Sequence, residues 1–296
     1  MKEVLRQYLS QYVRRIDQGI AEELEKRLSE VKTISPQLVP ILEAMKELSV
    51  GGKRLRAMLV ILGYQLSGHE VNNEVIRVAV AVELFHLGLL IQDDFMDRDE
   101  LRRGVKTIIA RYEDKHVGNF ISMLAGDYTF GWVAEILSSL NLPSKEVNRA
   151  IRVWGKYMTR VGYGQTLDGL AIADEATILQ ILSIKSGEYS CVMPLLIGAT
   201  LGGAEQGQLD QLEKYGMAVG HVFQLRDDWL GMYGDQEKTG KPVGHDQREG
   251  KHTYATMHGK ERTEAEIAKK LKAGLELAGE NQVMCELLNW VASRDN

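Results

Sequence analysis

Cysteine and proline are scarce in this sequence of 296 residues. Two cysteines, Cys191 and Cys285, are too few for a disulfide framework or a cysteine-rich zinc site, so the chain suits a reducing compartment. Only five prolines occur, and because proline interrupts helices, this favours long helices. A hydrophobic fraction of 44% and a charged fraction of 26% exclude global disorder.

Long apolar runs and an excess of basic charge are also missing. The most apolar stretch, 78–91, is interrupted by Glu83 and His86 and is shorter than the ~20 residues that a membrane span needs. It predicts a buried helix and no stable membrane insertion. The first residues are charged and lack the apolar core of a signal peptide, so a cytoplasmic location is expected. The net charge of −5 argues against nucleic acid as a partner.

Helical periodicity dominates what is present. Residues 35–36 and 141–144 are predicted to connect helices, with Ser144 as an N-cap, and 173–177 to begin another helix. The glycine-containing segment 233–252 is predicted to be a long functional loop. Because no linker divides the chain, we expect one all-α domain over residues 1–296. The helical spacing is clearest in the apolar residues Leu5, Leu9, Tyr12, Val13 and Ile16.

A first aspartate cluster, Asp93, Asp94 and Asp97, follows the apolar stretch. Asp93 and Asp97 are four residues apart and share one helical face, where like charges destabilise a helix unless a cation screens them. Carboxylates at the end of a buried helix suit Mg²⁺, which keeps several waters and is completed by substrate phosphates. The alternative interpretation is a solvated acidic helix end.

A second pair, Asp227 and Asp228, also follows an apolar stretch. The position four residues after Asp227 is Gly231, so the spaced pair of the first cluster is absent. Taken alone, this pair is equally consistent with a structural role. Two aspartate pairs after separate apolar helices are much less expected by chance, which favours a shared metal-binding function.

Basic residues accompany these carboxylates. Segment 51–56 has two glycines, which let a backbone approach a ligand, followed by three cations. Arg102 and Arg103 follow the first cluster. Taken singly, each basic group is consistent with a solvated helix end. Arginine and lysine are the usual direct ligands of phosphate, so carboxylates and cations together predict a polyphosphorylated substrate held by bridging Mg²⁺. Further basic residues near glycines are Lys185, Lys241 and Lys251.

The order of these motifs resembles that of trans-isoprenyl diphosphate synthases of the polyprenyl synthetase family. The resemblance covers about Gly51 to Thr253, and seven motifs in one order are far more specific than any one alone. They are Gly-Gly-Lys-Arg-x-Arg from Gly51, Asp-Asp-x-x-Asp from Asp93, Leu-Arg-Arg-Gly from Leu101, Gly-Asp at Gly126, Gly-Gln-x-x-Asp from Gly164, Lys-Ser-Gly from Lys185 and Gln-x-x-Asp-Asp from Gln224.

The resemblance implies an orthogonal helical bundle of the isoprenoid synthase type around a deep central cavity, in a homodimer. It implies that Asp93, Asp97 and Asp227 bind three Mg²⁺ ions, which chelate an allylic diphosphate, and that Asp94 and Asp228 support them. The residues implied to bind the same diphosphate are Arg102, Lys185, Lys241 and Lys251. Those implied to hold isopentenyl diphosphate are Lys53, Arg56, His86 and Arg103, while Ser186 and Gln224 are implied to face the reacting carbons.

The implied reaction adds isopentenyl diphosphate to the allylic cation that remains when diphosphate departs. Bulky residues four or five positions before the first aspartate shorten the product in this family. Leu89 and Gly88 stand there and are not aromatic. We therefore expect geranylgeranyl diphosphate, with farnesyl or somewhat longer products as alternatives. Phe85 is predicted to form a deeper cavity floor, and Met123 and Trp132 are further candidates to close the cavity.

Three rival functions are weighed against this interpretation. A terpene cyclase or head-to-head synthase needs no second substrate pocket, so Lys53, Arg56 and Arg103 argue against it. A regulatory subunit would be expected to lack the aspartate clusters, and a structural scaffold would leave them unexplained. Departures from the family pattern leave the leading metal ligands intact: Ala57, Gln92, Ser186 and Gly231 replace the common Pro, His, Thr and Asp.

Overall fold

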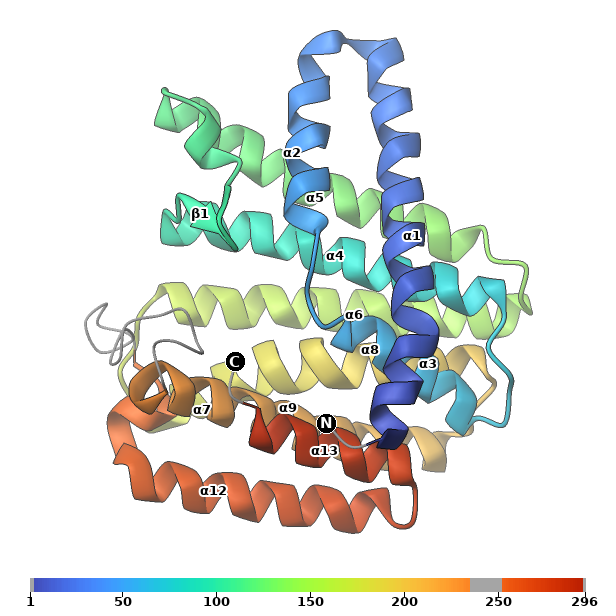
Figure 1. Cartoon of the computed structure of the whole chain (residues 1–296), viewed down its shortest axis with the longest axis vertical. Helices are drawn as coiled ribbons and strands as arrows, with labels where there is room; N and C mark the ends of the chain where they lie inside the picture. The colour runs from blue at the N-terminus through green and yellow to red at the C-terminus, as the bar shows by residue number, and fades with distance from the viewer. Residues whose placement is uncertain (1–2, 235–251, 295–296) are drawn as a thin grey trace.

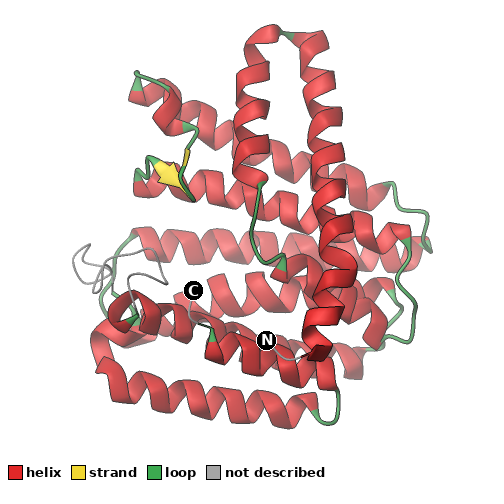
Figure 2. Ribbon diagram, in the orientation of Figure 1, coloured by secondary structure: helices red, strands yellow, loops and turns green. Residues whose placement is uncertain are grey.

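The computed structural model describes residues 3–234 and 252–294, and Figure 2 shows that nearly all of this part is helical. The first elements are α1 (Glu3–Ile34), the 3₁₀-helix η1 (Pro36–Leu38), α2 (Val39–Ser49), α3 (Leu55–Leu66), α4 (Asn73–Asp97), the strands β1 (Leu101–Arg102) and β2 (Val105–Lys106), the 3₁₀-helix η2 (Ile109–Arg111) and α5 (Lys115–Ser138). Then follow α6 (Ser144–Gly169), α7 (Glu175–Ile181), the π-helix η3 (Leu182–Val192), α8 (Met193–Leu201), α9 (Gln206–Tyr233), α12 (Tyr254–Ala278) and α13 (Gln282–Ser293). The predicted all-α class is confirmed.

Several helices begin where the sequence supplies a side-chain acceptor. Asp174 caps α7 by accepting from the Thr177 amide, which confirms the helix start predicted over 173–177. The predicted N-cap Ser144 is wrong, because Pro143 holds the N-cap position and Ser144 is the first helical residue. Proline suits the start of a helix because the amide that it lacks would be unpaired there. The predicted loop over 233–252 lies almost wholly outside the described residues.

The helices pack in the arrangement that Figure 1 shows. α1 and α2 run side by side and extend beyond the other helices, while α12 lies at the opposite end of the molecule. Between them α5 packs on α4, η3 packs on α6 and on α9, and α12 packs on α9. No helix in the described ranges combines the length and the apolar composition needed to cross a bilayer.

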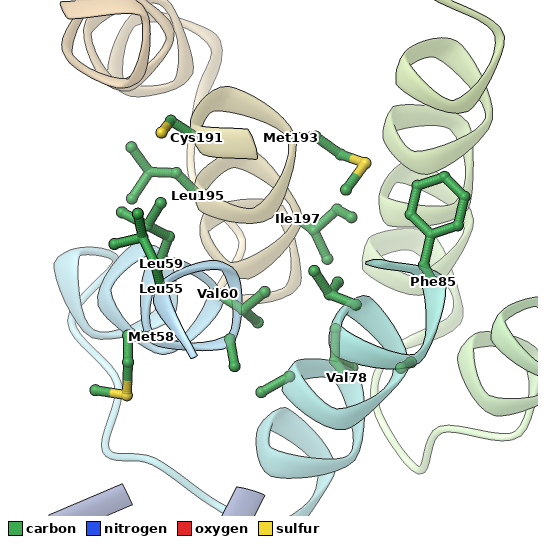
Figure 3. Close-up of a cluster of buried hydrophobic side chains, with 14 of the residues drawn as sticks. Leu55, Met58, Leu59, Val60, Val78, Phe85, Cys191, Met193, Leu195 and Ile197 are labelled. Carbon is green, nitrogen blue, oxygen red and sulfur yellow. The ribbon is translucent and has the colours of Figure 1, made fainter. Parts of the chain in front are cut away.

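In the core, α3 packs closely on α8. Figure 3 shows Leu59 and Val60 of α3 beside Leu195 and Ile197 of α8. The two backbones approach closely, since a Cβ added to Gly198 would lie 1.9 Å from the carbonyl oxygen of Val60. The stretch 78–91 lies within α4, and most of its residues are buried, as predicted. This rigid centre holds α4 and η3, which carry much of the site described next.

Candidate active site

Two adjoining pockets lie between the helices. The larger, of about 830 Å³, is lined by residues of α4, α6, η3 and α9. The smaller, of about 410 Å³, is lined by segment 51–56, α4, the β1–β2 hairpin and residues of α9 and α13. Their shared wall consists of Arg56, His86, Leu90, Ser190 and Phe223. Two ligands bound in these pockets would therefore meet at this wall.

Asp93 brings a carboxylate to the larger pocket from the last turn of α4. Gln165 of α6 donates to Asp93 Oδ1 at 2.9 Å, and Lys185 Nζ lies 3.9 Å from the same oxygen. Arg102 Nη2 lies 4.0 Å from Asp93 Oδ2. Asp97 is the last residue of the helix and is exposed. The carboxylate of Asp93 is thus surrounded by donors that can also bind a phosphate.

Asp94 has a different environment from that of its neighbour. Its side chain is only 2% exposed, and it accepts from Arg102 Nε at 2.5 Å. Burial raises the pKa of Asp94, and the Arg102 guanidinium opposes that rise. The other oxygen, Oδ2, is buried and has no hydrogen-bond partner within 3–234 and 252–294. Asp94 therefore fixes Arg102 at the edge of the first cluster.

The β1–β2 hairpin sends two consecutive arginines in different directions. Its central residues, Arg103 and Gly104, both have positive φ, 53° and 79°. Positive φ at both positions is typical of a type I′ turn, which fits the twist of two paired strands. Arg102 reaches the first aspartate cluster, whereas Arg103 lines the smaller pocket and lies beside Gly52.

The π-helix η3 presents Lys185 and Ser186 to the larger pocket. Lys185 Nζ donates to Asp168 of α6 at 2.5 Å, and Ser186 Oγ donates to Gln224 Oε1 at 2.5 Å. A π-helix widens each turn and re-aims side chains, and such segments are frequent at functional sites. This π-helix could not be predicted, because local propensities do not distinguish π from α turns.

The two aspartates of the second pair have separate roles in the structure. Asp228 is buried and accepts from Gln224 Nε2 at 2.8 Å and from the amide of Tyr254 at 3.2 Å. It thereby joins α9 to the start of α12. Asp227 is 42% exposed and forms an ion pair with Arg294, which follows α13. Asp227 is therefore the member of the pair with an accessible carboxylate.

The smaller pocket concentrates positive charge. Arg56 donates to Ser190 Oγ at 2.7 Å and lies 4.8 Å from the ring centroid of Tyr189. Lys53 lies over the Trp290 ring. Burial lowers the pKa of Lys53, and the positive charge of Arg294 lowers it further. Arg103 completes this cationic lining. Such a pocket suits a ligand with several negative charges.

His86 stands at the shared wall of the two pockets. Its Nδ1 lies 2.9 Å from the Tyr189 hydroxyl. Burial, together with Arg56 and Arg103, holds the pKa of His86 well below its usual range. The lowered pKa favours the neutral imidazole, which interacts with a ligand by hydrogen bonding rather than by charge.

The chain is similar to known proteins over most of its length. Residues 39–288 match the polyprenyl synthetase family. The chain is 32% identical over 266 residues to the short chain isoprenyl diphosphate synthase of Methanocaldococcus jannaschii, covering 89% of this chain and 78% of that protein. It is 33% identical over 249 residues to the geranylgeranyl diphosphate synthase of Methanosarcina mazei, covering 81% and 75%.

The chain belongs to the polyprenyl synthetase family. It is a trans-prenyltransferase of the polyprenyl diphosphate synthase class. Its fold is similar to that of the geranylgeranyl pyrophosphate synthase of Corynebacterium glutamicum, solved with isoprenyl diphosphate and magnesium. The TM-score is 0.85 at 24% identity, with 97% of this chain and 99% of that chain covered. The predicted isoprenoid synthase type of bundle is thus confirmed.

The aspartates of this family member fit Mg²⁺ by their chemistry. Asp93 and Asp227 have partly exposed carboxylates, and Asp94 Oδ2 is buried without a partner in the described part of the chain. No group of three or more His, Cys, Asp or Glu within the described ranges is arranged to hold a metal ion alone. Oxygens of a bound diphosphate would have to complete the coordination, which is the usual way that proteins hold Mg²⁺.

The structure also corrects the predicted cavity floor. Phe85 is fully buried and does not line the larger pocket; it packs behind Phe130 of α5, with ring centroids 5.5 Å apart. Neither Met123 nor Trp132 lines the pocket within the described residues. Helical spacing alone did not show that the Phe130 ring lies between Phe85 and the pocket.

Some functional contacts were missed and some predictions fall outside the structure. Sequence reasoning did not identify Gln165 as a partner of Asp93, although its motif contains this residue, nor Arg294 as a partner of Asp227. It counted Arg54 among the cations of segment 51–56 but did not assign it to a substrate; Arg54 lines the smaller pocket. The predicted diphosphate ligands Lys241 and Lys251 lie outside the described residues.

Proposed function

We propose that this enzyme joins isopentenyl diphosphate, bound in the smaller pocket, to an allylic diphosphate bound in the larger one. The observation that supports this assignment is the pair of adjoining pockets, one lined by Asp93 and Lys185 and the other by Lys53, Arg56 and Arg103. Two diphosphates need two sets of counter-charges, and the shared wall would bring their carbon chains together. A cyclase, which takes one diphosphate, would leave the smaller pocket without a ligand.

In this proposal, Asp93, Asp97 and Asp227 hold three Mg²⁺ ions. When bound, the magnesium neutralises the charge that develops on the departing diphosphate. Lys185 and Arg102 contribute donors to the same anion, and they need little rearrangement because Asp168 and Asp94 already orient them. Lys53, Arg56 and Arg103 fix isopentenyl diphosphate so that its double bond faces the allylic carbon.

The reaction proposed at the shared wall breaks the allylic carbon–oxygen bond and forms a carbon–carbon bond. Ser186 and Gln224, which line the larger pocket and are hydrogen-bonded to each other, exclude water from the allylic cation. One proton leaves the new carbon chain, and the released diphosphate is the acceptor that we propose. The product is a trans-prenyl diphosphate that is longer by one isoprene unit.

We propose geranylgeranyl diphosphate as the main product, with Phe130 limiting its length. Phe130 lines the larger pocket and is backed by Phe85, which itself contacts the rings of Trp154 and Tyr189. This stack of aromatic rings cannot move aside easily, because close-packed interiors resist displacement. The prenyl chain would grow away from Asp93 until it met the ring of Phe130.

A homodimer is proposed from the exposed apolar side chains of α5. Val117, Phe120 and Met123 lie on α5 with 38%, 54% and 42% exposure. A second copy of this chain would cover them. Light scattering of the purified protein should give twice the chain mass, and Phe120→Asp should shift it toward the monomer.

The reaction is tested by incubating the purified protein with Mg²⁺, isopentenyl diphosphate and each allylic primer in turn. The dephosphorylated products are then sized by chromatography. Asp93→Ala should abolish turnover with the fold intact, while the control Glu100→Ala, at a side chain 77% exposed, should retain it. Full activity of Asp93→Ala would exclude Asp93 from its proposed role.

A further inference from the structure

Arg294 is a cation of the smaller pocket and lies outside the sequence motifs described above. It follows the last helix, yet it lines the same pocket as Lys53, Arg56 and Arg103. Its side chain is only 6% exposed. A buried guanidinium carries a large desolvation cost, so its partners should account for its position.

The contacts of Arg294 leave part of its donor capacity unused. It pairs with Asp227 Oδ1, donates from Nη2 to the Phe223 carbonyl at 2.9 Å, and stacks on the Phe223 ring with Cζ 3.7 Å from the centroid. Its Nε is buried and has no hydrogen-bond partner in the part of the chain that the structure describes. Arg294 also lowers the pKa of Lys53 while Asp227 raises it, so these three charges share one environment.

Asp227 cannot serve Arg294 and a metal ion equally well. Its carboxylate is 42% exposed and therefore open to a competing cation, whereas Arg294 is held at the pocket by the Phe223 contacts. If a divalent ion takes the carboxylate, the guanidinium loses Asp227, its acidic partner within residues 3–234 and 252–294, but stays buried. A buried charge that has lost its counter-ion binds the next available anion strongly.

We propose that Arg294 is a ligand of the isopentenyl diphosphate headgroup and that Asp227 holds it until metal binds. This inference rests on the proposed function, because it uses the assignment of the smaller pocket to that substrate. Arg294 exchanges a carboxylate for a diphosphate, so metal binding at Asp227 and substrate binding in the smaller pocket favour each other. Such coupling is reciprocal: each ligand tightens the binding of the other by the same factor.

The test measures binding without turnover. The full chain is titrated with isopentenyl diphosphate by calorimetry, with an allylic thiolodiphosphate present as an unreactive partner, in buffer with Mg²⁺ or with a chelator. Arg294→Gln should weaken binding in Mg²⁺ roughly tenfold to a hundredfold, as expected for a lost charge-assisted hydrogen bond. The control Arg14→Gln, at an exposed position of α1, should bind as the wild type does.

Asp227→Asn gives a second, opposite prediction. In metal-free buffer it should bind isopentenyl diphosphate more tightly than the wild type, because Arg294 is released without any ion. The gain must vanish in the double variant Asp227→Asn/Arg294→Gln. A gain that persists there would be a general effect of removing negative charge and would overturn the proposal, as would the absence of any gain.

Lys53→Gln separates this inference from the proposed function. If Lys53→Gln weakens binding and Arg294→Gln does not, the pocket assignment stands and the role of Arg294 is refuted. If neither variant changes the dissociation constant, the smaller pocket is not the isopentenyl diphosphate site and both proposals fail. Thermal unfolding of each variant checks that it is folded. If Arg294→Gln does not fold, the binding of isopentenyl diphosphate to Asp227→Asn in metal-free buffer tests the role of Arg294 instead.

Discussion

Replacing the buried Glu83 tests how the smaller pocket is built. Glu83 Oε1 accepts from the Ala57 amide at 3.1 Å, and Oε2 lies 3.4 Å from Arg54 Nη1. The exposed fractions are 5% for the Glu83 side chain and 9% for Arg54. Arg54 has the left-handed backbone conformation, φ 51°, at the start of α3, so this pair holds a strained turn between Lys53 and Arg56.

Glu83→Ala should lower the free energy of unfolding by about 3 kcal/mol. Removing one partner of a buried ion pair costs ~3–5 kcal/mol. The lower end applies because Arg54 keeps Asp17, at 2.7 Å, and the Ser49 carbonyl, at 2.8 Å. For a chain of this size, the loss corresponds to a fall in Tm of roughly 6–12 °C. Circular dichroism at 222 nm during heating measures it.

Two variants serve as controls for this prediction. Glu83→Gln keeps an acceptor for the Ala57 amide but removes the charge, so it should be less destabilising and should still raise the KM for isopentenyl diphosphate. Asp17→Ala removes a carboxylate that is 50% exposed, and it should cost under about 1 kcal/mol. If Glu83→Ala melted within about 2 °C of the wild type with an unchanged KM, the pair would not organise this pocket.

Three further changes test the packing, the product length and the pH dependence. Phe130→Ala should lengthen the product, which chromatography detects; an unchanged distribution excludes Phe130 as the limit. Gly198→Ala should destabilise by ~1–3 kcal/mol, whereas Gly155→Ala, with open space around it, should gain up to ~1 kcal/mol in urea unfolding. Burial, and then the charge of Lys270, lower the pKa of His221 to about 4. Protonation of His221 therefore disfavours the folded state: the free energy of unfolding is highest above pH 6.5 and is about 2 kcal/mol lower at pH 5. His221→Asn should flatten that part of the pH profile.

The helices and the aspartate clusters could be predicted because each depends on neighbouring residues. The apolar stretch before Asp93 predicted a buried helix, and spacing placed Asp93 and Asp97 on one face of it. Neighbouring residues of a helix point in different directions, which is why Asp94 is buried against Arg102 while Asp93 stays open. The sequence pattern contained this difference but did not show which residue faced inward.

Contacts between distant segments could not be predicted in the same way. Arg294 and Asp227 meet only because α13 packs on α9. The directions of Arg102 and Arg103 follow from the positive φ values of a short hairpin. No periodic pattern in the sequence predicts this hairpin. Phe130 hides Phe85 from the pocket because α5 packs on α4, which the spacing of α4 alone does not show.

Two ion pairs of the site, Arg54–Glu83 and Lys185–Asp168, differ in burial. In the Arg54–Glu83 pair both side chains are below 10% exposure, so neither can leave without a large desolvation cost. In the Lys185–Asp168 pair the side chains are 26% and 49% exposed, and water competes for both. The Arg54–Glu83 pair therefore fixes the shape of a pocket, whereas Lys185 can exchange the Asp168 carboxylate for a substrate anion.

This difference predicts opposite responses to removing each cation. Arg54→Gln should lower Tm clearly and weaken substrate binding as a consequence, because a buried carboxylate is left without its partner. Lys185→Gln should change the free energy of unfolding by under about 1 kcal/mol, since exposed pairs contribute little, yet it should weaken binding of the allylic diphosphate. Thermal melts and calorimetric titrations of both variants measure the two quantities. Equal losses of stability in the two variants would show that burial does not distinguish ion pairs that stabilise the fold of the site from those that bind the substrate.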